Sequence, residues 1–411
     1  MKMHRGYIVA AACAVLTVLS ATIINSIGIF YIPVTQEFGI SMTKMSLAIT
    51  VFNISYTVCM PLLNRIINKY DLRVVTAVCI IGFALSFVIR ALAKNIVWFY
   101  VSAVIQGNTW MIIVGLLGPI IANNWFHKGT ATVIALISLC TNIGGFIFNA
   151  IGGVVIQTHG WRTCYWVWVL ITLVVGLPFC FFIHRSPEEM GLQPFGYAEK
   201  GDSIAAEVKN LGMNAKAAMR TPAFWLIGGA MALDCFGDNF SSFISAYAQV
   251  LGVTAITAGL MSSCVQFGGI GSKLLLGPIC DKKANAGAIL SNGFGMLAFL
   301  GFILIGKIGF STLAYGTVCV IYGCAYSASN IGFASITSNT FGPREFSKLW
   351  PSLNMFIGVF GIFAGVTFGM LIDNFGYLVA QKLGALIYLL ATVFVVIVAM
   401  SCKKYKEKWT E

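Results

Sequence analysis

Long apolar stretches separated by short polar segments run along the whole chain. A helix of about 20 apolar residues crosses the roughly 30 Å hydrocarbon core of a bilayer, so each stretch predicts one membrane-spanning helix. Twelve stretches meet this criterion: 7–32, 45–63, 74–93, 96–121, 130–156, 163–183, 223–247, 256–280, 285–306, 311–338, 349–372 and 377–400. The pattern predicts an all-α integral membrane protein with twelve transmembrane helices.

A long polar segment between the sixth and seventh stretches divides the spans into two sets of six. It carries five of the fourteen acidic residues and is typical of a linker with some helix. We therefore expect four parts: an N-terminal six-helix bundle at 1–183, a cytoplasmic linker at 184–222, a C-terminal six-helix bundle at 223–400 and a cytoplasmic tail at 401–411.

The two sets of spans share glycines and polar residues at a spacing of about 216 residues. The matched pairs are Gly107 and Gly323, Asn123 and Asn339, Lys128 and Arg344, Gly145 and Gly361, Gly153 and Gly369, Ile156 and Ile372, and Gly160 and Gly376. Each match alone is weak, because glycine is abundant in this chain. Their common order predicts a duplicated six-helix unit, which is the plan of many secondary transporters.

The net charge of +12 does not indicate a nucleic-acid partner, because the basic residues follow the predicted topology. With both termini in the cytoplasm, 19 of the 26 lysines and arginines fall in cytoplasmic segments. Such an excess sets the orientation of membrane helices. We expect a multi-pass protein of the cell membrane with both termini cytoplasmic, and a lysine-rich tail that contacts anionic lipid.

Metal, cofactor and enzyme chemistry have no recognisable motif here. The twelve cysteines are scattered without a C-x-x-C pair, and the four histidines fall in loops or termini. The metalloprotease, hydrolase and phosphate-loop signatures are absent from the sequence. We expect neither an enzyme nor a bound metal or cofactor, and we interpret the cysteines as small apolar packing residues.

Several local motifs resemble one family of transporters. They are "NRIINKYDLR", "GPICDKK", "NNWFHKGTATVIALISLCTNIGG", "HGWRTCYWV", "RSPEEMGLQP" and "RTPAFWLI". Together they resemble the major facilitator superfamily and, within it, the branch of oxalate/formate antiporters and monocarboxylate transporters. The resemblance implies two pseudo-symmetric six-helix bundles, transport by alternating access and a monomer.

Two of these motifs sit where the superfamily has its charged cytoplasmic loops, of the form G-x-x-x-D-[RK]-x-G-R. The resemblance therefore implies gate residues in both loops, namely Lys69, Arg73, Asp281 and Lys282. The first loop departs from the pattern, because Asn64 replaces the first glycine, Asn68 the aspartate and Asp71 the second glycine. The fifth span reads "FNAIGG" where drug antiporters have G-P-x-x-G-G, which counts against a drug exporter.

Lys273 is the one basic residue deep inside a predicted span, since Arg90 and Lys382 fall near the outer ends of theirs. The resembling branch carries a cation in the eighth helix that binds substrate carboxylate, and "GSK" puts Lys273 there. An ammonium in hydrocarbon is costly without a negative partner. Two interpretations stay open: Lys273 binds substrate, or it extends its side chain toward the cytoplasmic headgroups, since Asp281 lies roughly 12 Å along the helix.

Asp234 and Asp238 lie four residues apart in the seventh span and thus on one helix face. Asp234 falls roughly 16 Å deep at helical rise, near the depth of Lys273. Asp234 is the candidate partner of Lys273 and a candidate proton site, or else a fixed ion pair. Asp238 is a second protonatable group, or it is exposed in the outer vestibule.

The superfamily resemblance implies that helices 1, 4, 7 and 10 line the central cavity. It thereby makes Asn25, Tyr31, Trp110, Tyr322 and Tyr326 candidate substrate contacts. Amides and phenols in spans also serve as hydrogen-bonding links between helices, and this interpretation stays open for each.

These features predict a secondary active transporter of small organic anions, driven by proton coupling or anion exchange. A dianion would be expected to meet two buried cations, but Lys273 is the only one expected, since Arg90 falls near the outer end of its span, where an interfacial position is expected. A monocarboxylate-like substrate is therefore favoured. The alternatives are a zwitterionic, amino-acid-like substrate, a larger amphipathic acid, and a ligand sensor of the same fold.

Overall fold

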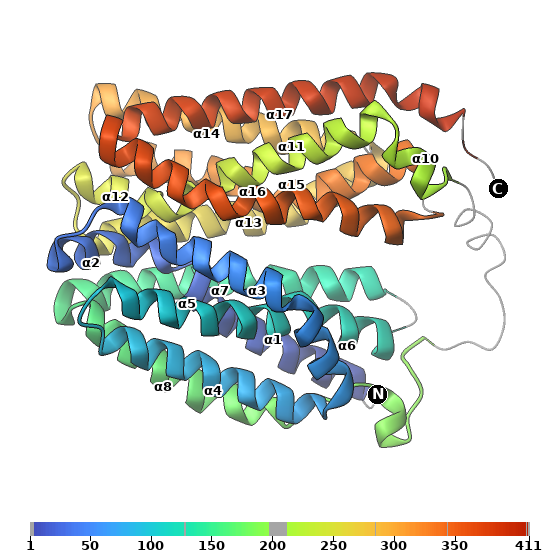
Figure 1. Ribbon diagram of the computed structural model, residues 1–411, viewed down its shortest axis with the longest axis horizontal. Helices are drawn as coiled ribbons and strands as arrows, with labels where there is room; N and C mark the ends of the chain where they lie inside the picture. The colour runs from blue at the N-terminus through green and yellow to red at the C-terminus, as the bar shows by residue number, and fades with distance from the viewer. Residues whose placement is uncertain are drawn as a thin grey trace. The chain divides into compact units, whose positions relative to one another are not determined.

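The computed structural model describes residues 4–126, 129–196, 212–283, 285–342, 344–407 and 409. Regular structure in these ranges is helical, and ten of the helices found there are long and apolar enough to cross a membrane. The two other predicted spans are helical too: 223–247 falls on two consecutive helices, and 256–280 lies within one long helix. The predicted all-α membrane fold is confirmed (Figure 1).

The chain divides into two compact units. Unit 1 comprises Met1–Glu199 and Ile244–Ser263, and unit 2 comprises Lys200–Phe243 and Cys264–Glu411. The helices up to residue 199 are α1 (Arg5–Ile24), η1 (Ile27–Phe30), α2 (Tyr31–Phe38), α3 (Met42–Lys69), α4 (Leu72–Ala91), α5 (Ile96–Trp110), the π-helix η2 (Met111–Leu117), α6 (Gly118–Trp125), α7 (Thr130–His159), α8 (Trp161–Cys180) and η3 (Pro187–Met190).

The helices after residue 211 complete the fold. They are α10 (Ala215–Met219), α11 (Pro222–Asp238), α12 (Ser241–Val250), α13 (Ala255–Lys282), α14 (Ala286–Ile308), α15 (Thr312–Phe341), α16 (Phe346–Phe375) and α17 (Tyr377–Lys406). The unit boundaries fall near the start of α12 and within α13, so α13 begins in unit 1 and continues in unit 2. The parts predicted from the sequence differ at this point, because they place residues 244–263 in the C-terminal bundle, whereas these residues belong to unit 1.

Matched glycines hold equivalent positions in the two sets of helices. A Cβ atom on Gly107 would lie 2.5 Å from the carbonyl oxygen of Phe52, and one on Gly323 would lie 1.9 Å from that of Val265. These contacts let α5 cross α3, and α15 cross α13, backbone against backbone. Small residues permit such close helix crossings in membranes. The pairing of Gly107 with Gly323 thus has a structural counterpart in each unit.

Another matched pair of glycines joins the last two helices of each set. Gly160 connects α7 to α8 with φ 83° and ψ 164°, and Gly376 connects α16 to α17 with φ 77° and ψ 174°. This backbone conformation favours glycine because it has no Cβ. The sharp reversals at equivalent places agree with a duplicated unit.

The predicted first and seventh spans are wrong as single continuous helices. The first is interrupted after Ile24, where Asn25 is the C-cap residue, and the seventh after Asp238, where Asn239 is the C-cap residue. At the second break a side-chain bond to a local carbonyl competes with helix continuation, since Asn239 Nδ2 donates to Cys235 O at 2.8 Å. At the first break Asn25 Nδ2 donates to Thr141 O on α7 at 3.0 Å. The two breaks are separated by nearly the spacing of about 216 residues that relates the two sets of spans.

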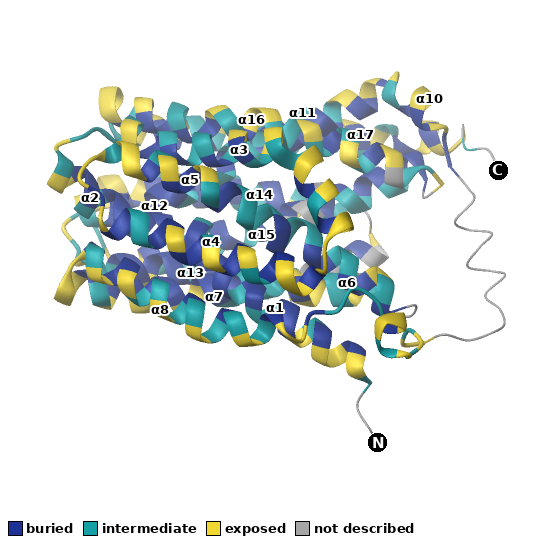
Figure 2. Cartoon of the chain, turned by 60° about the horizontal axis from the view of Figure 1, so that its bottom comes forward, coloured by how far each residue is buried: buried dark blue, intermediate teal, exposed yellow. Residues whose placement is uncertain are grey.

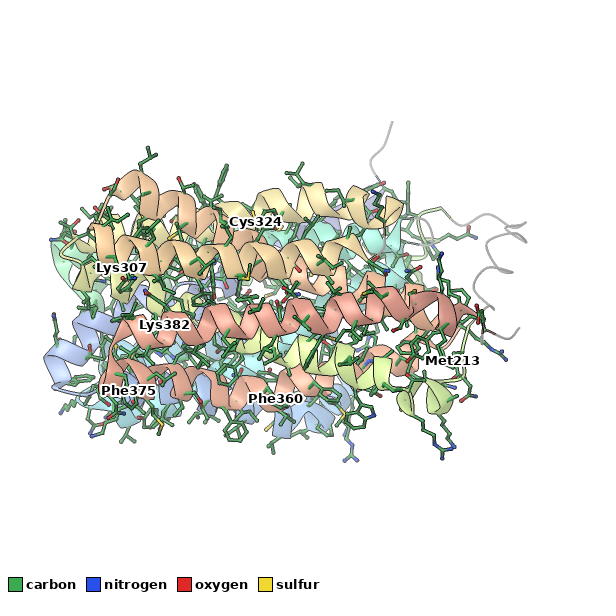
Figure 3. All side chains as sticks on the ribbon, turned by 90° about the horizontal axis from the view of Figure 1, so that it is seen from above. Met213, Lys307, Cys324, Phe360, Phe375 and Lys382 are labelled. Carbon is green, nitrogen blue, oxygen red and sulfur yellow. The ribbon has the colours of Figure 1, made fainter. Side chains whose placement is uncertain are left out.

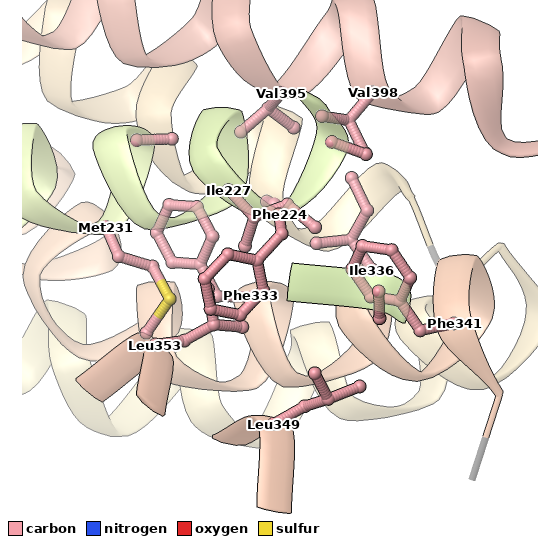
Figure 4. Packing of buried hydrophobic residues seen from close by; sticks show 14 of the residues in the cluster. Phe224, Ile227, Met231, Phe333, Ile336, Phe341, Leu349, Leu353, Val395 and Val398 are labelled. Carbon is pink, nitrogen blue, oxygen red and sulfur yellow. The ribbon is translucent and has the colours of Figure 1, made fainter. Parts of the chain in front are cut away.

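A dense apolar cluster fills the interior of unit 2 (Figure 4). Helices α11, α15, α16 and α17 contribute its labelled side chains: Phe224, Ile227, Met231, Phe333, Ile336, Phe341, Leu349, Leu353, Val395 and Val398. Thr221 accepts a hydrogen bond from the amide of Phe224, and Pro222 follows it as the first helical residue. This N-cap fixes the start of α11.

Other helix faces are exposed (Figure 2). On α4, Val74, Val78, Ile81 and Leu85 are 58%, 62%, 52% and 51% exposed and share one face. A stripe of this kind suits contact with lipid rather than water. At one end of unit 2 lie the exposed Lys307 and Lys382, and Met213 lies at the opposite end (Figure 3). The protein is a multi-pass membrane protein.

Candidate functional site

A pair of carboxylates on α11 forms the centre of the candidate site. Asp234 is buried, with 3% of its surface exposed, and Asp238 follows one turn later and is partly buried. The hydroxyl of Ser329, on α15, interacts with the Asp234 carboxylate. Oδ1 of Asp234 is buried and has no hydrogen-bond partner among the described residues. An acceptor in this position is poised to take a hydrogen bond or a proton.

Two buried tyrosines hold the end of α11 against its neighbours. The Tyr388 hydroxyl, from α17, donates a 2.7 Å hydrogen bond to Oδ1 of Asp238. The Tyr322 hydroxyl, from α15, lies 2.9 Å from the carbonyl oxygens of both Gly237 and Asp238. The last carbonyls of a helix have no partner within it, so Tyr322 stabilises the break that follows α11.

Tyr326 lies one turn along α15 from Tyr322. It is partly buried and within electrostatic range of Asp238 and Cys235. Four residues from α11 and α15 that carry oxygen groups, namely Asp234, Asp238, Tyr322 and Tyr326, therefore come together in unit 2. All four belong to the set predicted from the sequence.

Lys273 lies on α13 at the depth of Asp234. Helices α13 and α15 run in the same direction and touch where the Cys324 thiol lies 3.5 Å from the carbonyl oxygen of Gly268. Five residues further along each helix are Lys273 and Ser329, and Ser329 reaches the Asp234 carboxylate. The equal rise of parallel helices thus places the partly buried Lys273 level with Asp234.

The other three predicted contacts lie in unit 1. Asn25, at the break after α1, is held by α7, where its amide donates to Thr141 O and its carbonyl accepts from Asn149 Nδ2, each at 3.0 Å. Tyr31 is fully buried at the start of α2. Trp110 ends α5 immediately before the π-helix η2, and its ring lies 5.7 Å from that of Phe52. Short π-helical segments frequently mark functional sites.

A family model described as the Major Facilitator Superfamily matches residues 13–364. The chain belongs to the major facilitator superfamily. A bacterial homolog to the human lysosomal transporter Spinster, inward-facing and unoccupied, has the same fold, with a TM-score of 0.73 and 15% identity over 100% of this chain and 99% of that one. The nucleoside transporter NupG aligns with a TM-score of 0.70 and 14% identity over 98% and 100%.

The relatives found by sequence match only part of this chain and part of their own length. A triacylglyceride transporter of Mycobacterium tuberculosis is 26% identical over 166 residues, covering 39% of this chain and 30% of the relative. Sugar phosphate exchanger 3 of Mus musculus is 28% identical over 182 residues, covering 41% and 35%. The chain thus matches about a third of the length of these relatives. The predicted superfamily is confirmed, and the oxalate/formate branch is not supported by these matches.

The superfamily loop after α3 is held together by local bonds. Asp71 accepts the amide hydrogen of Arg73 at 2.8 Å, and its carboxylate pairs with the Arg73 guanidinium at 3.1 Å. The Arg73 amide, and then its charge, hold the pKa of Asp71 below its usual range. The exposed Lys69 lies 5.5 Å from the ring centroid of Tyr70. The side chains of the other two predicted gate residues, Asp281 and Lys282, lie outside the described residues.

Some residues of this site were not anticipated. Tyr388 and Ser329 contact the carboxylates, although each stands in an apolar span with no motif around it. Their contacts join helices far apart in the sequence, so spacing alone gives no signal. Arg90 lies in the last turn of α4, near the end of its span as predicted, but it is buried within the protein, with only 2% of its surface exposed.

Proposed function

We propose that this protein is a secondary active transporter of small organic anions, coupled to protons and working by alternating access. The observation that carries this proposal is the carboxylate pair of α11, buried at the depth of Lys273 and beside a break in the helix. Interrupted helices near the middle of the membrane form the substrate and ion sites of many transporters.

In this proposal Lys273 binds the substrate carboxylate. A carboxylate leaving water needs a fixed positive charge, and an ammonium at this depth needs a negative partner. One lysine favours a monocarboxylate-like substrate. Tyr326, in the same unit, contributes a further contact to its body, whereas Tyr322 acts through α11, because its hydroxyl already lies on the carbonyls there.

Asp234 and Asp238 form the proton site. A buried carboxylate without a full set of partners is costly to keep ionised, and two on the same helical turn repel each other. When substrate occupies Lys273, a proton on this pair keeps the occupied site close to neutral. The charge that crosses the membrane is then small, which couples substrate movement to proton movement.

The relatives support transport in general and anion exchange in one case. Sugar phosphates are organic anions, and the mouse relative is named as an exchanger of them. Exchange of one anion for another would use Lys273 without a proton on Asp234. Proton coupling is favoured here because the carboxylates outnumber the lysine at this depth.

A second candidate substrate is a zwitterion of the amino-acid type. It is favoured by Oδ1 of Asp234, a buried acceptor without a partner among the described residues. An ammonium group on the substrate would donate to this oxygen while its carboxylate binds Lys273.

Uptake by proteoliposomes tests these proposals. Labelled formate, acetate, lactate, oxalate and several amino acids would be offered with and without an inward proton gradient. The proposal predicts accumulation of a monocarboxylate that requires the gradient, and Asp234→Asn should lose this accumulation while keeping exchange of internal for external substrate. Accumulation of an amino acid instead would favour the zwitterion, and the absence of accumulation of every compound would contradict transport of either class.

A further inference from the structure

A buried cation in unit 1 lies outside the site described above. Arg90, in the last turn of α4, donates from Nε to the Ser102 hydroxyl at 2.7 Å. Its guanidinium lies 5.3 Å from the ring centroid of Phe99 and 5.8 Å from that of Tyr165. The aromatic faces and the carbonyl end of α4 favour a positive charge here. The Tyr165 hydroxyl also interacts with this guanidinium.

No acidic side chain among the described residues of unit 1 is positioned to neutralise this charge. The described residues of unit 1 include four acids: Glu37, Asp71, Glu188 and Glu189. Glu37 is engaged by Trp161 and Arg162. Asp71 caps the opposite end of α4, and the two others follow the far end of α8. Since unpaired charges are expensive to bury, the guanidinium requires an anion from outside this set.

Further donors without acceptors extend along the same helices. Gln106 follows Ser102 by one turn of α5, and both of its side-chain polar atoms are buried without partners in the described ranges. On α8 the same holds for Tyr165 Oη, Trp168 Nε1 and Thr172 Oγ1, which follow one another on a single face. The Tyr165 hydroxyl lies near Arg90, which joins the two rows.

Buried polar groups are nearly always hydrogen-bonded, so a cluster of exceptions points to an unseen partner. Arginine, indole and carboxamide nitrogens are donors, and hydroxyls donate readily. Gln106 Oε1 is the only group in the cluster that can accept without also donating. A cluster rich in donors and free of acids selects an anion.

We propose that Arg90, Gln106 and Tyr165 form a binding site for a small monovalent anion, either a halide or the carboxylate of a small organic acid. The site lies in unit 1, whereas Lys273 lies in unit 2, and it does not depend on the proposed transport function. The bound anion would neutralise Arg90 and accept the unused hydrogen bonds. It would thereby stabilise the packing of α4, α5 and α8.

Thermal unfolding of the purified protein in neutral detergent tests this site. The melting temperature would be measured in potassium gluconate, whose anion is too large for the site, and during replacement by chloride, formate or acetate at constant ionic strength. We expect one or more of the small anions to raise the melting temperature by several degrees. A response to chloride alone identifies a halide site, and a response to the acids identifies a carboxylate site.

Variants assign the response to these residues. Arg90→Gln should abolish it, whereas Lys307→Gln, which removes an exposed lysine of unit 2, should leave it unchanged. If Arg90→Gln does not fold, Gln106→Leu keeps the test decisive. If the site binds an anion, as proposed, Gln106→Leu should lose most of the rise in melting temperature. If the site binds no anion, the substitution only removes a costly unpaired amide, and the variant melts higher than the wild type in every salt. Equal melting of the wild type in all four salts, or an unchanged response in both variants, would overturn the proposal.

Discussion

The Tyr388 hydroxyl donates to Oδ1 of Asp238 at 2.7 Å and so ties α17 to the point where α11 ends. The same tyrosine ring fills the space that the missing side chain of Gly237 leaves, since a Cβ there would come within 2.6 Å of it. One residue of the last helix therefore fixes both the carboxylate and the backbone beside the break. This arrangement makes the contribution of the hydroxyl measurable.

Tyr388→Phe should lower the stability of the protein by about 1–2 kcal/mol. The ring and its packing remain, but a buried carboxylate oxygen loses its donor. Thermal unfolding in detergent would measure the change. Tyr405→Phe is the control on the same helix, because this tyrosine is also buried and its hydroxyl has no hydrogen-bond partner among the described residues. If both substitutions cost the same, the bond to Asp238 contributes nothing specific.

Asp234→Asn should fold with nearly wild-type stability and should lose proton-coupled uptake. Asparagine has the same shape and no charge, so it imitates a carboxyl group that has taken up its proton. A permanent ion pair would behave differently, because removing one partner of a buried pair typically costs about 3–5 kcal/mol. Melting temperatures and gradient-driven uptake, measured on the same preparation, separate these cases.

Gly323→Ala should destabilise the protein by about 2 kcal/mol or more. The new methyl group would lie 1.9 Å from the Val265 carbonyl oxygen, and backbone atoms cannot move aside as a flexible side chain can. Gly271→Ala is the matched control in α13, since nothing lies within 4 Å of its Cβ position. There alanine should be neutral or stabilising by up to about 1 kcal/mol. Equal effects at both positions would contradict the close crossing of α13 and α15.

Asp71→Ala should reduce stability at neutral pH by about 1 kcal/mol, because α4 loses its N-cap. The folded protein holds the pKa of Asp71 below its unfolded value, so the stabilising effect is present above about pH 4 and is lost as the pH falls below that value. The gap between wild type and variant should therefore shrink in acid. Asp71→Asn should keep most of the cap and show a much weaker pH dependence. A gap that is constant from pH 7 to pH 3 would exclude a role for the charge.

The sequence predicts the fold well because spans and their connections depend on local composition. Each of the ten described helices that are long and apolar enough to cross a membrane falls on a stretch predicted by hydropathy, and the match between Gly160 and Gly376 corresponds to two equivalent reversals of the chain. The breaks after α1 and α11 were not predicted, because an asparagine in an apolar run does not by itself end a helix. Asn25 and Asn239 recur near the repeat spacing, and this recurrence is the signal that could have located both breaks.

The candidate site was only partly predictable for a similar reason. Asp234 and Asp238 stand out in an apolar span, since charges there are expensive. Their partners Tyr388 and Ser329 come from other helices, and only tertiary packing brings them near. The burial of Arg90 also depends on distant residues, because Ser102 and Tyr165 surround it from α5 and α8.

Ligand-induced thermal stabilisation, compared between wild type and Lys273→Gln, tests the central claim most directly. The panel would contain mono- and dicarboxylates and amino acids, and Lys307→Gln would serve as the control for loss of a positive charge. We predict that at least one small carboxylate stabilises the wild type and the control variant but not Lys273→Gln. Equal stabilisation of all three proteins by the same ligand would contradict a substrate carboxylate at Lys273 and would leave this lysine with a structural role.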